Sequence, residues 1–429
     1  MGNYIPSTDL QQQEMLKEAG FSSFEDLYRD VPEELLLKHE LNLPSGKSEL
    51  EASKTLRKLA DKNKVYSSIF RGAGAYHHYI PSIVTSVVNK EEFVTAYTPY
   101  QAEISQGVLQ SIFEYQTMIC ELTGMDVSNA SVYDGAVAAA EAVSMCRSPK
   151  KKKVYVSEGV HPDTMKVIRT YSWAYGDEII PLALKDGLTD PADLKEEAAC
   201  VVIQQPNYYG VIEDVRALVS AAHEKGIQVI LSMNPIAMAS LPCPGEYGAD
   251  IAVGEGQPLG MPLSYGGPYL GFMAATSKMM RKLPGRIVGQ TVDSEGNKAY
   301  VLTLQAREQH IRREKASSNI CSNEALCALT ASVYLAAMGP DGIREVAKQC
   351  CSKAHYLAEK LEEAGLKRRF KADFFHEFVT DCQEPEKLIA KLAEKDILGG
   401  LPVDGGILWC CTEMNSKEEI DALVQEVAQ

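Results

Sequence analysis

A polar turn that opens a helix contains residues that could bind a charged group. Residues 128–136 read Ser-Asn-Ala-Ser-Val-Tyr-Asp-Gly-Ala and lead into an alanine-rich helix that we expect to end near Cys146. Free backbone N–H groups and the helix dipole converge at such a start, so Ser131, Asp134 and Gly135 could bind a phosphate. The same residue types also make an ordinary helix cap, and their spacing alone does not separate the two interpretations.

A second group of polar side chains lies in the run from Arg71 to Pro81, Arg-Gly-Ala-Gly-Ala-Tyr-His-His-Tyr-Ile-Pro. Arg71, His77 and His78 are its candidates for a binding site. Adjacent histidines point in different directions on any regular element, so we do not expect them to share a metal ion. The alternative interpretation is a buried loop whose imidazoles have hydrogen-bond partners.

An aromatic and polar segment precedes a long helix that we expect from about Ile104 to Gly124. We call residues 97–103 the aromatic strip; its candidate residues are Tyr97, Tyr100, Gln101 and Glu103. Pro99 disfavours helix before it and directs the following side chains outward from the helix start. The strip therefore either lines a pocket or closes the start of the helix.

Positive charge is concentrated in residues 307–315, which we call the basic run. On a helix Glu308 would face Arg312, so part of the run is typical of a solvated ion-pair surface. The remaining cations could bind a phosphate or a substrate carboxylate. The candidates are Arg307, Arg312, Arg313 and Lys315.

The elements that must position these residues alternate between helices and short apolar strands from about residue 61 to residue 330. We expect strands at 153–156, 178–182, 199–204, 227–232, 249–253 and 269–274. Such alternation predicts βαβ units and a mostly parallel sheet in a large α/β domain.

The two ends of the chain differ from this central zone. Residues 1–60 read as a helical arm, in which Thr8 and Gln11 fit a capping box. Residues 331–429 read as a small α+β domain, with strands near 370–379 and 407–411, a helix at 384–392 and a last helix capped by Ser416 and Glu419.

Composition restricts the function classes. The chain has 429 residues, 45% of them hydrophobic, and a formal net charge of −15, which argues against nucleic acid or an anionic membrane as a partner. We see no stretch apolar enough to span a bilayer and no signal peptide, so we expect a cytoplasmic protein. The eleven cysteines lack the spacing of a zinc or redox motif, so we expect reduced thiols and no metal.

These segments, in this order, resemble the glycine cleavage system P-protein family, and within it the first subunit of the two-subunit type of glycine decarboxylase. The resemblance covers nearly the whole chain and includes the start Met-Gly-x-Tyr-Ile-Pro-Ser-Thr. The other matching runs are 70–81, 96–107, 121–136, 254–271 and 302–316.

The resemblance implies a fold type I pyridoxal-phosphate architecture in two homologous subunits, of which only the other carries the Schiff-base lysine. Gln257 stands at the lysine position when Gly266-Gly267-Pro268 is used as the anchor. Asn234 stands where such enzymes place the aspartate that pairs with the pyridine nitrogen. The resemblance thus implies that pyridoxal phosphate is held covalently by the partner subunit, and that the turn at Ser131, Asp134 and Gly135 is a remnant.

The reaction implied by the resemblance is decarboxylation of glycine, followed by transfer of the aminomethyl group to the lipoyl arm of H-protein. This chain would supply one wall of the partner's site and assemble with it as a dimer of heterodimers. The wall candidates are Tyr97, Tyr100, Gln101 and Glu103, then Arg71, His77 and His78, with Arg312, Arg313 and Lys315 as anion or substrate candidates.

Two other classes stay open on the sequence. One is an independent enzyme, either with another lysine such as Lys315 or as a nucleotide-binding oxidoreductase, although the chain lacks a Gly-x-Gly-x-x-Gly turn with an acidic residue in the right place. The other is a non-catalytic binding or regulatory protein on a dead pyridoxal-phosphate fold.

Overall fold

The computed structural model describes residues 7–39 and 41–428, and the chain separates into two compact units, Met1–Val65 and Tyr66–Gln429. In the first unit, α1 (Asp9–Glu18) and α2 (Glu49–Ala60) each begin with a capping box, on Thr8 and on Ser48. The box predicted for Thr8 and Gln11 is therefore confirmed. No residue of these two helices is buried, so the unit has little core of its own.

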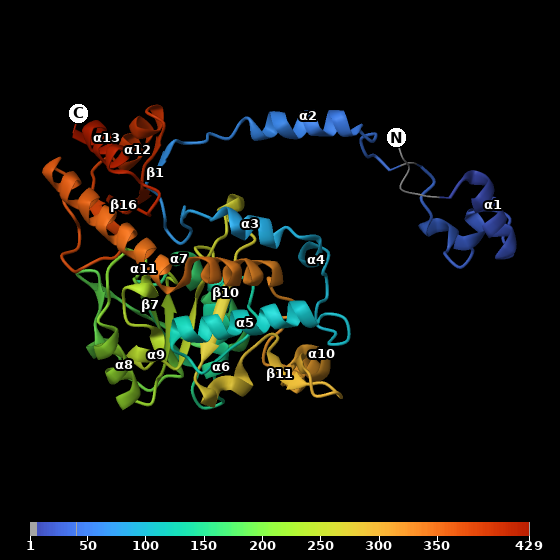
Figure 1. Cartoon of the computed structure of the whole chain (residues 1–429), viewed down its shortest axis with the longest axis horizontal. Coiled ribbons are helices and arrows are strands. Elements are labelled where there is room, and N and C mark those ends of the chain that lie inside the picture. Colours follow the sequence, from blue (N-terminus) through green and yellow to red (C-terminus); the bar gives the residue numbers. More distant parts are fainter. Residues whose placement is uncertain (1–6, 40, 429) are drawn as a thin grey trace. The chain divides into compact units, whose positions relative to one another are not determined.

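The second unit is built around a central sheet (Figure 1). Its seven strands have the order β2-β10-β9-β8-β7-β3-β4. Neighbours from β9 to β4 are parallel, and β10 runs antiparallel to both β9 and β2, which confirms the predicted mostly parallel sheet. The strands are β2 (Val127–Ser128), β3 (Lys153–Ser157), β4 (Glu178–Leu182), β7 (Cys200–Gln205), β8 (Gln228–Met233), β9 (Ile251–Glu255) and β10 (Gly271–Ala275).

Helices cover both faces of this sheet because its central strands are apolar on both sides. Helices α6 (Gly135–Cys146) and α7 (Pro162–Tyr175) pack together on one face, over a core that includes Val156 and Ile230. The other core includes Tyr115 and Leu231 and takes side chains from α5 (Gln106–Thr123), α8 (Val215–Glu224) and α11 (Ala325–Glu363).

Helix α5 begins two residues later than the sequence predicts. Ser105 has the non-helical angles φ −120° and ψ 26°, and Ile104, expected on the apolar face, is 79% exposed. The aromatic strip therefore lies in irregular backbone ahead of the helix.

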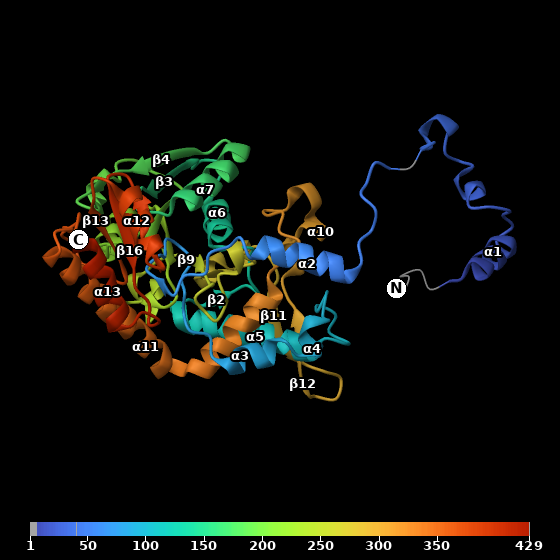
Figure 2. The same ribbon diagram turned by 90° about the horizontal axis from the view of Figure 1, so that it is seen from above.

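A small antiparallel sheet, β13-β16-β15, forms a separate core near the C-terminus (Figure 2). It consists of β13 (Glu377–Asp381), β15 (Leu401–Val403) and β16 (Gly406–Cys410), with α12 (Pro385–Glu394) and α13 (Lys417–Ala428). The strand expected at 370–379 begins only at Glu377, because Phe374 pairs away from the small sheet, in an isolated bridge with Val211. The helix cap predicted for Ser416 and Glu419 is present.

The domain boundary expected near residue 330 falls within helix α11. That boundary stays a prediction. The helix breaks at Gly339, which has φ +62° and precedes Pro340. The other elements of the second unit are β1 (Ser68–Ile69), α3 (Ser82–Val88), α4 (Glu91–Val94), β5 (Leu184–Lys185), β6 (Leu188–Thr189), α9 (Pro244–Tyr247), β11 (Val288–Val292), β12 (Lys298–Leu302), α10 (Gln309–Arg312) and β14 (Ile397–Leu398).

One helix is longer and more apolar than the sequence analysis allowed. Helix α11 contains an 18-residue window of mean hydropathy 1.3, so the expectation of no stretch apolar enough to span a bilayer is wrong as stated. The helix packs on α5 and α3 and contributes to both the sheet core and the small C-terminal core. Of the 18-residue window, 33% is buried within the chain.

Candidate functional site

A cavity of about 440 Å³ lies at the carboxyl ends of the parallel strands. Gln204 of β7, Asn234 after β8 and Glu255 of β9 line it, and the N-terminus of α6 closes one side with Asp134 and Gly135. Ligand sites of open α/β sheets are found at this edge, so the fold places a candidate site here.

The turn at the start of α6 is already occupied by acidic side chains of the chain itself. The Gly135 N–H donates to Glu255 Oε2 at 3.0 Å, and the Val137 N–H donates to Asp134 Oδ1 at 2.7 Å. Ser131 is buried and its hydroxyl accepts from Asn323 Nδ2 at 2.8 Å. The turn therefore works as a helix cap, with carboxylates where a phosphate would need free N–H groups.

Glu255 joins this turn to the segment that carries Gln257. Its Oε1 accepts from the Gln257 N–H at 3.0 Å and from the Leu270 N–H at 2.9 Å. Burial raises the pKa of Glu255 to about 7, although three backbone N–H groups lower it in part. The carboxyl is thus a fixed part of the cavity wall.

Gln257 is a structural residue in this chain. It is 1% exposed, its Oε1 accepts from the Tyr76 N–H at 2.8 Å, and its Nε2 donates to the Tyr76 carbonyl at 2.9 Å and the Met261 carbonyl at 2.8 Å. An amide does not form an imine, and this amide is fully used in joining two loops.

Asn234 lies on the cavity wall, and only the oxygen of its side-chain amide is hydrogen-bonded within the described residues. Its Oδ1 accepts from the Ile236 N–H at 2.9 Å, whereas its Nδ2 is buried and has no partner within the described residues. A neutral amide cannot provide the negative charge that holds a pyridine nitrogen in its protonated form. Asn234 on the wall and Glu255 on the Gly135 N–H therefore do not fit pyridoxal phosphate in this cavity.

The run from Arg71 to Pro81 fastens the small C-terminal sheet to the rest of its unit. Arg71 donates to the carbonyls of Gly399 at 3.2 Å and Gly400 at 2.9 Å, and burial lowers the pKa of its guanidinium. The His77 carbonyl accepts from Thr412 Oγ1 at 2.7 Å. None of Arg71, His77 and His78 lines the cavity.

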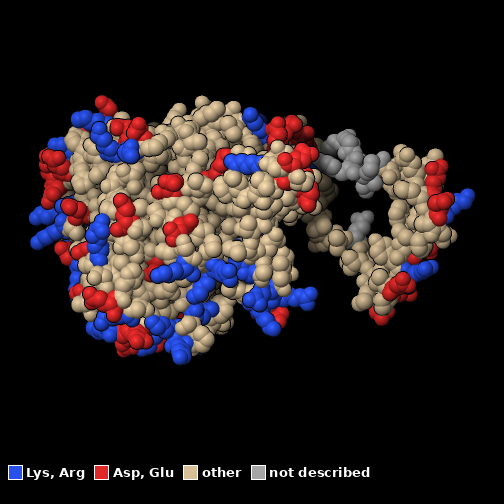
Figure 3. Space-filling view, turned by 60° about the horizontal axis from the view of Figure 1, so that its bottom comes forward, with Lys and Arg blue, Asp and Glu red and all other residues tan. Residues whose placement is uncertain are grey.

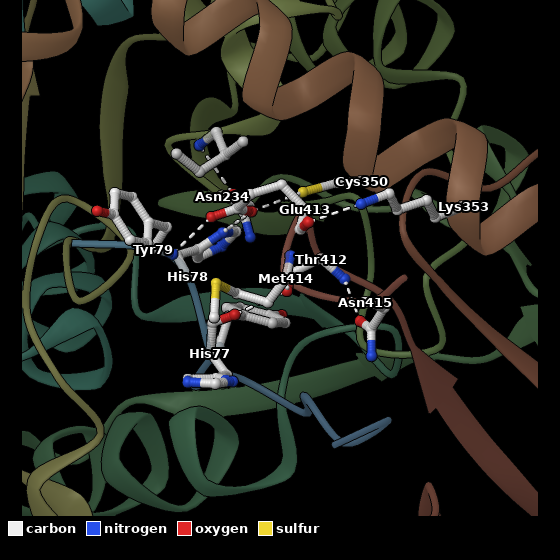
Figure 4. A network of polar contacts seen from close by, with 12 residues as sticks. His77, His78, Tyr79, Asn234, Cys350, Lys353, Thr412, Glu413, Met414 and Asn415 are labelled. Atoms are coloured by element: carbon white, nitrogen blue, oxygen red, sulfur yellow. Dashed lines mark hydrogen bonds and ion pairs between the residues drawn. The ribbon is translucent and has the colours of Figure 1, made fainter. Parts of the chain in front are cut away.

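His78 forms a network with residues far along the chain (Figure 4). Its Nδ1 lies 2.7 Å from Glu413 Oε2, and the Tyr79 N–H donates to Glu413 Oε1 at 2.6 Å. Burial raises the pKa of Glu413, but His78 and the Tyr79 N–H outweigh it and bring that pKa below its usual value. Cys350 completes a group whose donor atoms lie within 4.8 Å of one another, but the Lys353 ammonium, 2.6 Å from the Glu413 carbonyl, opposes a further cation there.

In the aromatic strip, the side chain of Tyr100 is hydrogen-bonded to the rest of the chain, and three other side chains are exposed. The Tyr100 hydroxyl donates to Asn323 Oδ1, and the Arg286 guanidinium lies 4.9 Å from the centre of the Tyr100 ring. Burial raises the pKa of Tyr100. Tyr97 is 96% exposed, and Gln101 and Glu103 are exposed as well.

The basic run forms short helical turns, and its predicted ion pair is wrong. Glu308 contacts Arg286, not Arg312, because the helix α10 spans only Gln309–Arg312 and Glu308 precedes it in extended backbone. Arg307 donates to the carbonyls of Leu283 and Gly285.

The last three cations of the basic run, Arg312, Arg313 and Lys315, are exposed. Their side chains have no hydrogen-bond or ion-pair partner in the described part of the chain. Figure 3 shows that basic side chains gather on one face of the second unit. These cations are therefore available to a partner or an anion.

Sequence reasoning missed several residues of the cavity wall. His161, Glu255, His376 and Glu377 line it. Glu255 could have been noticed as a carboxylate two residues before Gln257, but His376 and Glu377 reach the cavity from the small sheet, and no local motif marks them.

The sheet order and the cavity position define the class of the protein. The architecture is that of the fold type I pyridoxal-phosphate enzymes; for example, an alanine–glyoxylate aminotransferase from Nostoc sp. superposes with a TM-score of 0.60 over 86% of this chain and 96% of its own, at 15% identity. Within that class, the chain belongs to the glycine cleavage system P-protein family, whose match covers residues 2–427.

Two more specific relatives agree with this assignment. A probable glycine dehydrogenase (decarboxylating) subunit 1 of Moorella thermoacetica is 51% identical over 435 residues, with 98% of each chain covered. A crystal structure of glycine decarboxylase (P-protein) of the glycine cleavage system, in inhibitor-bound form, is 42% identical with a TM-score of 0.95, and the match covers 100% of this chain and 99% of that chain. The comparisons support the decarboxylase subunit over the dead-fold regulatory protein.

Proposed function

We propose that this chain is the lysine-less subunit 1 of glycine decarboxylase, which acts with a lysine-bearing subunit 2, glycine and the lipoylated H-protein. The observation that carries the proposal is Gln257, whose amide is buried and bonded to Tyr76 and Met261 at the position of the Schiff-base lysine. A chain of this family without that lysine needs a partner for the chemistry.

Pyridoxal phosphate, held by the partner, would supply the electron sink for loss of carbon dioxide. This chain would bind and orient groups at the interface with the side chains that its own fold leaves free. Tyr97, Gln101 and Glu103 are exposed beside the anchored Tyr100, which fixes the backbone of the aromatic strip. Arg312, Arg313 and Lys315 provide positive charge for a carboxylate or an acidic partner surface.

The assembly we propose is a cytoplasmic dimer of heterodimers. An isolated chain would expose its half of the shared interface, which is unfavourable for apolar side chains such as Tyr97 and Ile104. Light scattering after size exclusion of the co-expressed pair would give the mass directly, and elution as two separate chains at micromolar concentration would contradict the proposal.

The central experiment compares this chain alone, the partner alone and the pair. With pyridoxal phosphate added, a borohydride-reducible absorbance band should appear on the partner and be absent from this chain. Exchange of labelled carbon dioxide into glycine, with H-protein present, should require the pair. A reducible adduct mapped to a lysine of this chain would overturn the assignment.

A further inference from the structure

Acidic side chains line the cavity at the sheet edge. Asp134, Asp163, Glu255 and Glu377 line it, and no Lys or Arg does so in the part of the chain that the structure describes. Asp163 lies at the surface and pairs with Lys166 at 2.8 Å, whereas Glu377 is buried. Carboxylates in a partly desolvated cavity attract small cations and repel phosphate.

Glu377 is held with its carboxylate at the cavity. Its Oε1 accepts from the Ala73 N–H at 2.6 Å and its Oε2 accepts from the Tyr76 hydroxyl at 2.8 Å. Each carboxylate oxygen has a second lone pair, so the group can accept further hydrogen bonds. Burial raises the pKa of Glu377 to about 7.

A second observation, independent of the charge, indicates a ligand. His376 lines the cavity and is 3% exposed, yet neither ring nitrogen has a hydrogen-bond partner in the described structure. Burial, and then the nearby His78, lower the pKa of His376 to about 3, so its ring is neutral, with one donor and one acceptor nitrogen. Asn234 Nδ2 is a further unpaired donor on the same wall.

We infer that this cavity binds a small primary ammonium compound of net positive charge that also carries a neutral acceptor such as a hydroxyl. The ammonium group would bind at the Glu377 carboxylate, and the acceptor would take the N–H groups of Asn234 and His376. Buried polar groups are almost always partnered, and such a ligand supplies what these side chains lack. The side chains named for this site all belong to this chain, and the inference does not depend on the proposed assembly.

Calorimetric titration of the full chain tests the inference, with ethanolamine as the probe at pH 7.5 and a repeat on the complex with the partner. We expect saturable binding of ethanolamine, no measurable binding of ethylene glycol or inorganic phosphate, and weaker binding of glycine, which has no net charge. Ethylene glycol is the matched ligand, since it has nearly the same size without the charge.

Variants separate the site from a general charge effect. Glu377→Gln keeps an acceptor oxygen and should weaken ethanolamine binding about tenfold or more. The control is Glu141→Gln, which removes another buried carboxyl whose pKa is also raised to about 7 and which lies outside this cavity; binding should change less than about twofold.

A third variant should bind a ligand more tightly than the wild type, and misfolding cannot produce such a gain. Asn234→Asp keeps the oxygen that accepts from the Ile236 N–H and adds a carboxylate, so methylammonium should bind about threefold tighter or more. Absence of ethanolamine binding to the wild-type chain, or equal binding of ethylene glycol, would overturn the inference. Water would then be the hydrogen-bond partner of the His376 and Asn234 nitrogens.

Discussion

Two polar side chains beside the cavity are hydrogen-bonded within the chain, whereas most of those in the aromatic strip are exposed to solvent. At the cavity wall, Glu255 accepts three backbone N–H groups, and Gln257, two residues later, makes three hydrogen bonds to backbone, so both side chains serve the fold. In the strip, Tyr97, Gln101 and Glu103 are exposed, and Tyr100 alone is anchored. Glu255 and Gln257 are thus used within the chain, whereas the exposed side chains of the strip are available to a neighbour.

The largest effect should come from placing a lysine at position 257. Gln257→Lys removes the acceptor of the Tyr76 N–H and puts an ammonium group where a neutral amide is 1% exposed, so the free energy of unfolding should fall by roughly 3 kcal/mol. No decarboxylation should appear, because Asn234 and Glu255 stay in place. Urea denaturation measures the loss, with Gln13→Lys on the exposed face of α1 as the control.

The Gln257→Lys chain could instead be as stable as the wild type and form a reducible adduct with pyridoxal phosphate. This result would contradict the difference drawn between the cavity and the strip. Such a result would mean that the cavity still accepts the cofactor.

A second prediction concerns pH. The folded-state pKa of Glu377 is raised from 4.5 to about 7, so the folded chain holds its proton more tightly than the unfolded chain. Stability from this group is complete below about pH 4.5 and is lost as the pH rises through about 7. The free energy of unfolding of the wild type, relative to Glu377→Gln, should therefore fall by roughly 1–3 kcal/mol between pH 4.5 and 8.

Denaturation curves of both proteins at pH 4.5 and pH 8 give this difference directly. The subtraction removes other titrating groups, including His376 and Glu413. A difference that rises with pH would show that Glu377 is stabilised as a carboxylate in the chain by itself.

The third prediction separates function from stability in the aromatic strip. Gln101 is exposed and makes no side-chain hydrogen bond in the described structure, so Gln101→Ala should leave the melting temperature unchanged. In the complex with the partner and H-protein it should slow glycine–carbon dioxide exchange by about tenfold, which is about 1.4 kcal/mol of barrier. Gln13→Ala is the matched exposed control; equal rates for both variants would remove Gln101 from the wall.

The smallest effect is expected for Tyr100→Phe. This change deletes the hydrogen bond to Asn323 while keeping the ring against Arg286, so the free energy of unfolding should fall by about 1 kcal/mol. Because Tyr100 acts by positioning the strip, exchange should slow less than for Gln101→Ala. Differential scanning calorimetry measures the loss of stability, and the exchange assay compares the rates of the two variants. A larger rate loss for Tyr100→Phe than for Gln101→Ala would mean that Tyr100, and not Gln101, acts directly in the partner's site.

The sheet was predictable from the sequence because its buried strands are local apolar runs, as at β3, which was expected at 153–156 and spans Lys153–Ser157. The replaced residues Gln257 and Asn234 were identified through the resemblance. What they do instead was not predictable, since Tyr76 lies 181 residues from Gln257 and the pairing exists only after folding. The same holds for His78 and Glu413, which are 335 residues apart, and for His376, whose place on the cavity wall depends on the small sheet.

The unbroken part of helix α11 after Pro340 has a mechanical consequence. Cys350 belongs to the core of the large sheet, and Ala354, one turn later, belongs to the core of the small one. A rotation of one sheet against the other would have to bend the helix between these two residues, where it lacks a Gly or Pro. The second unit should therefore behave as a stiff support during turnover, with slow amide hydrogen exchange from Cys350 to Ala354, and the motions that admit glycine and the lipoyl arm would belong to the partner.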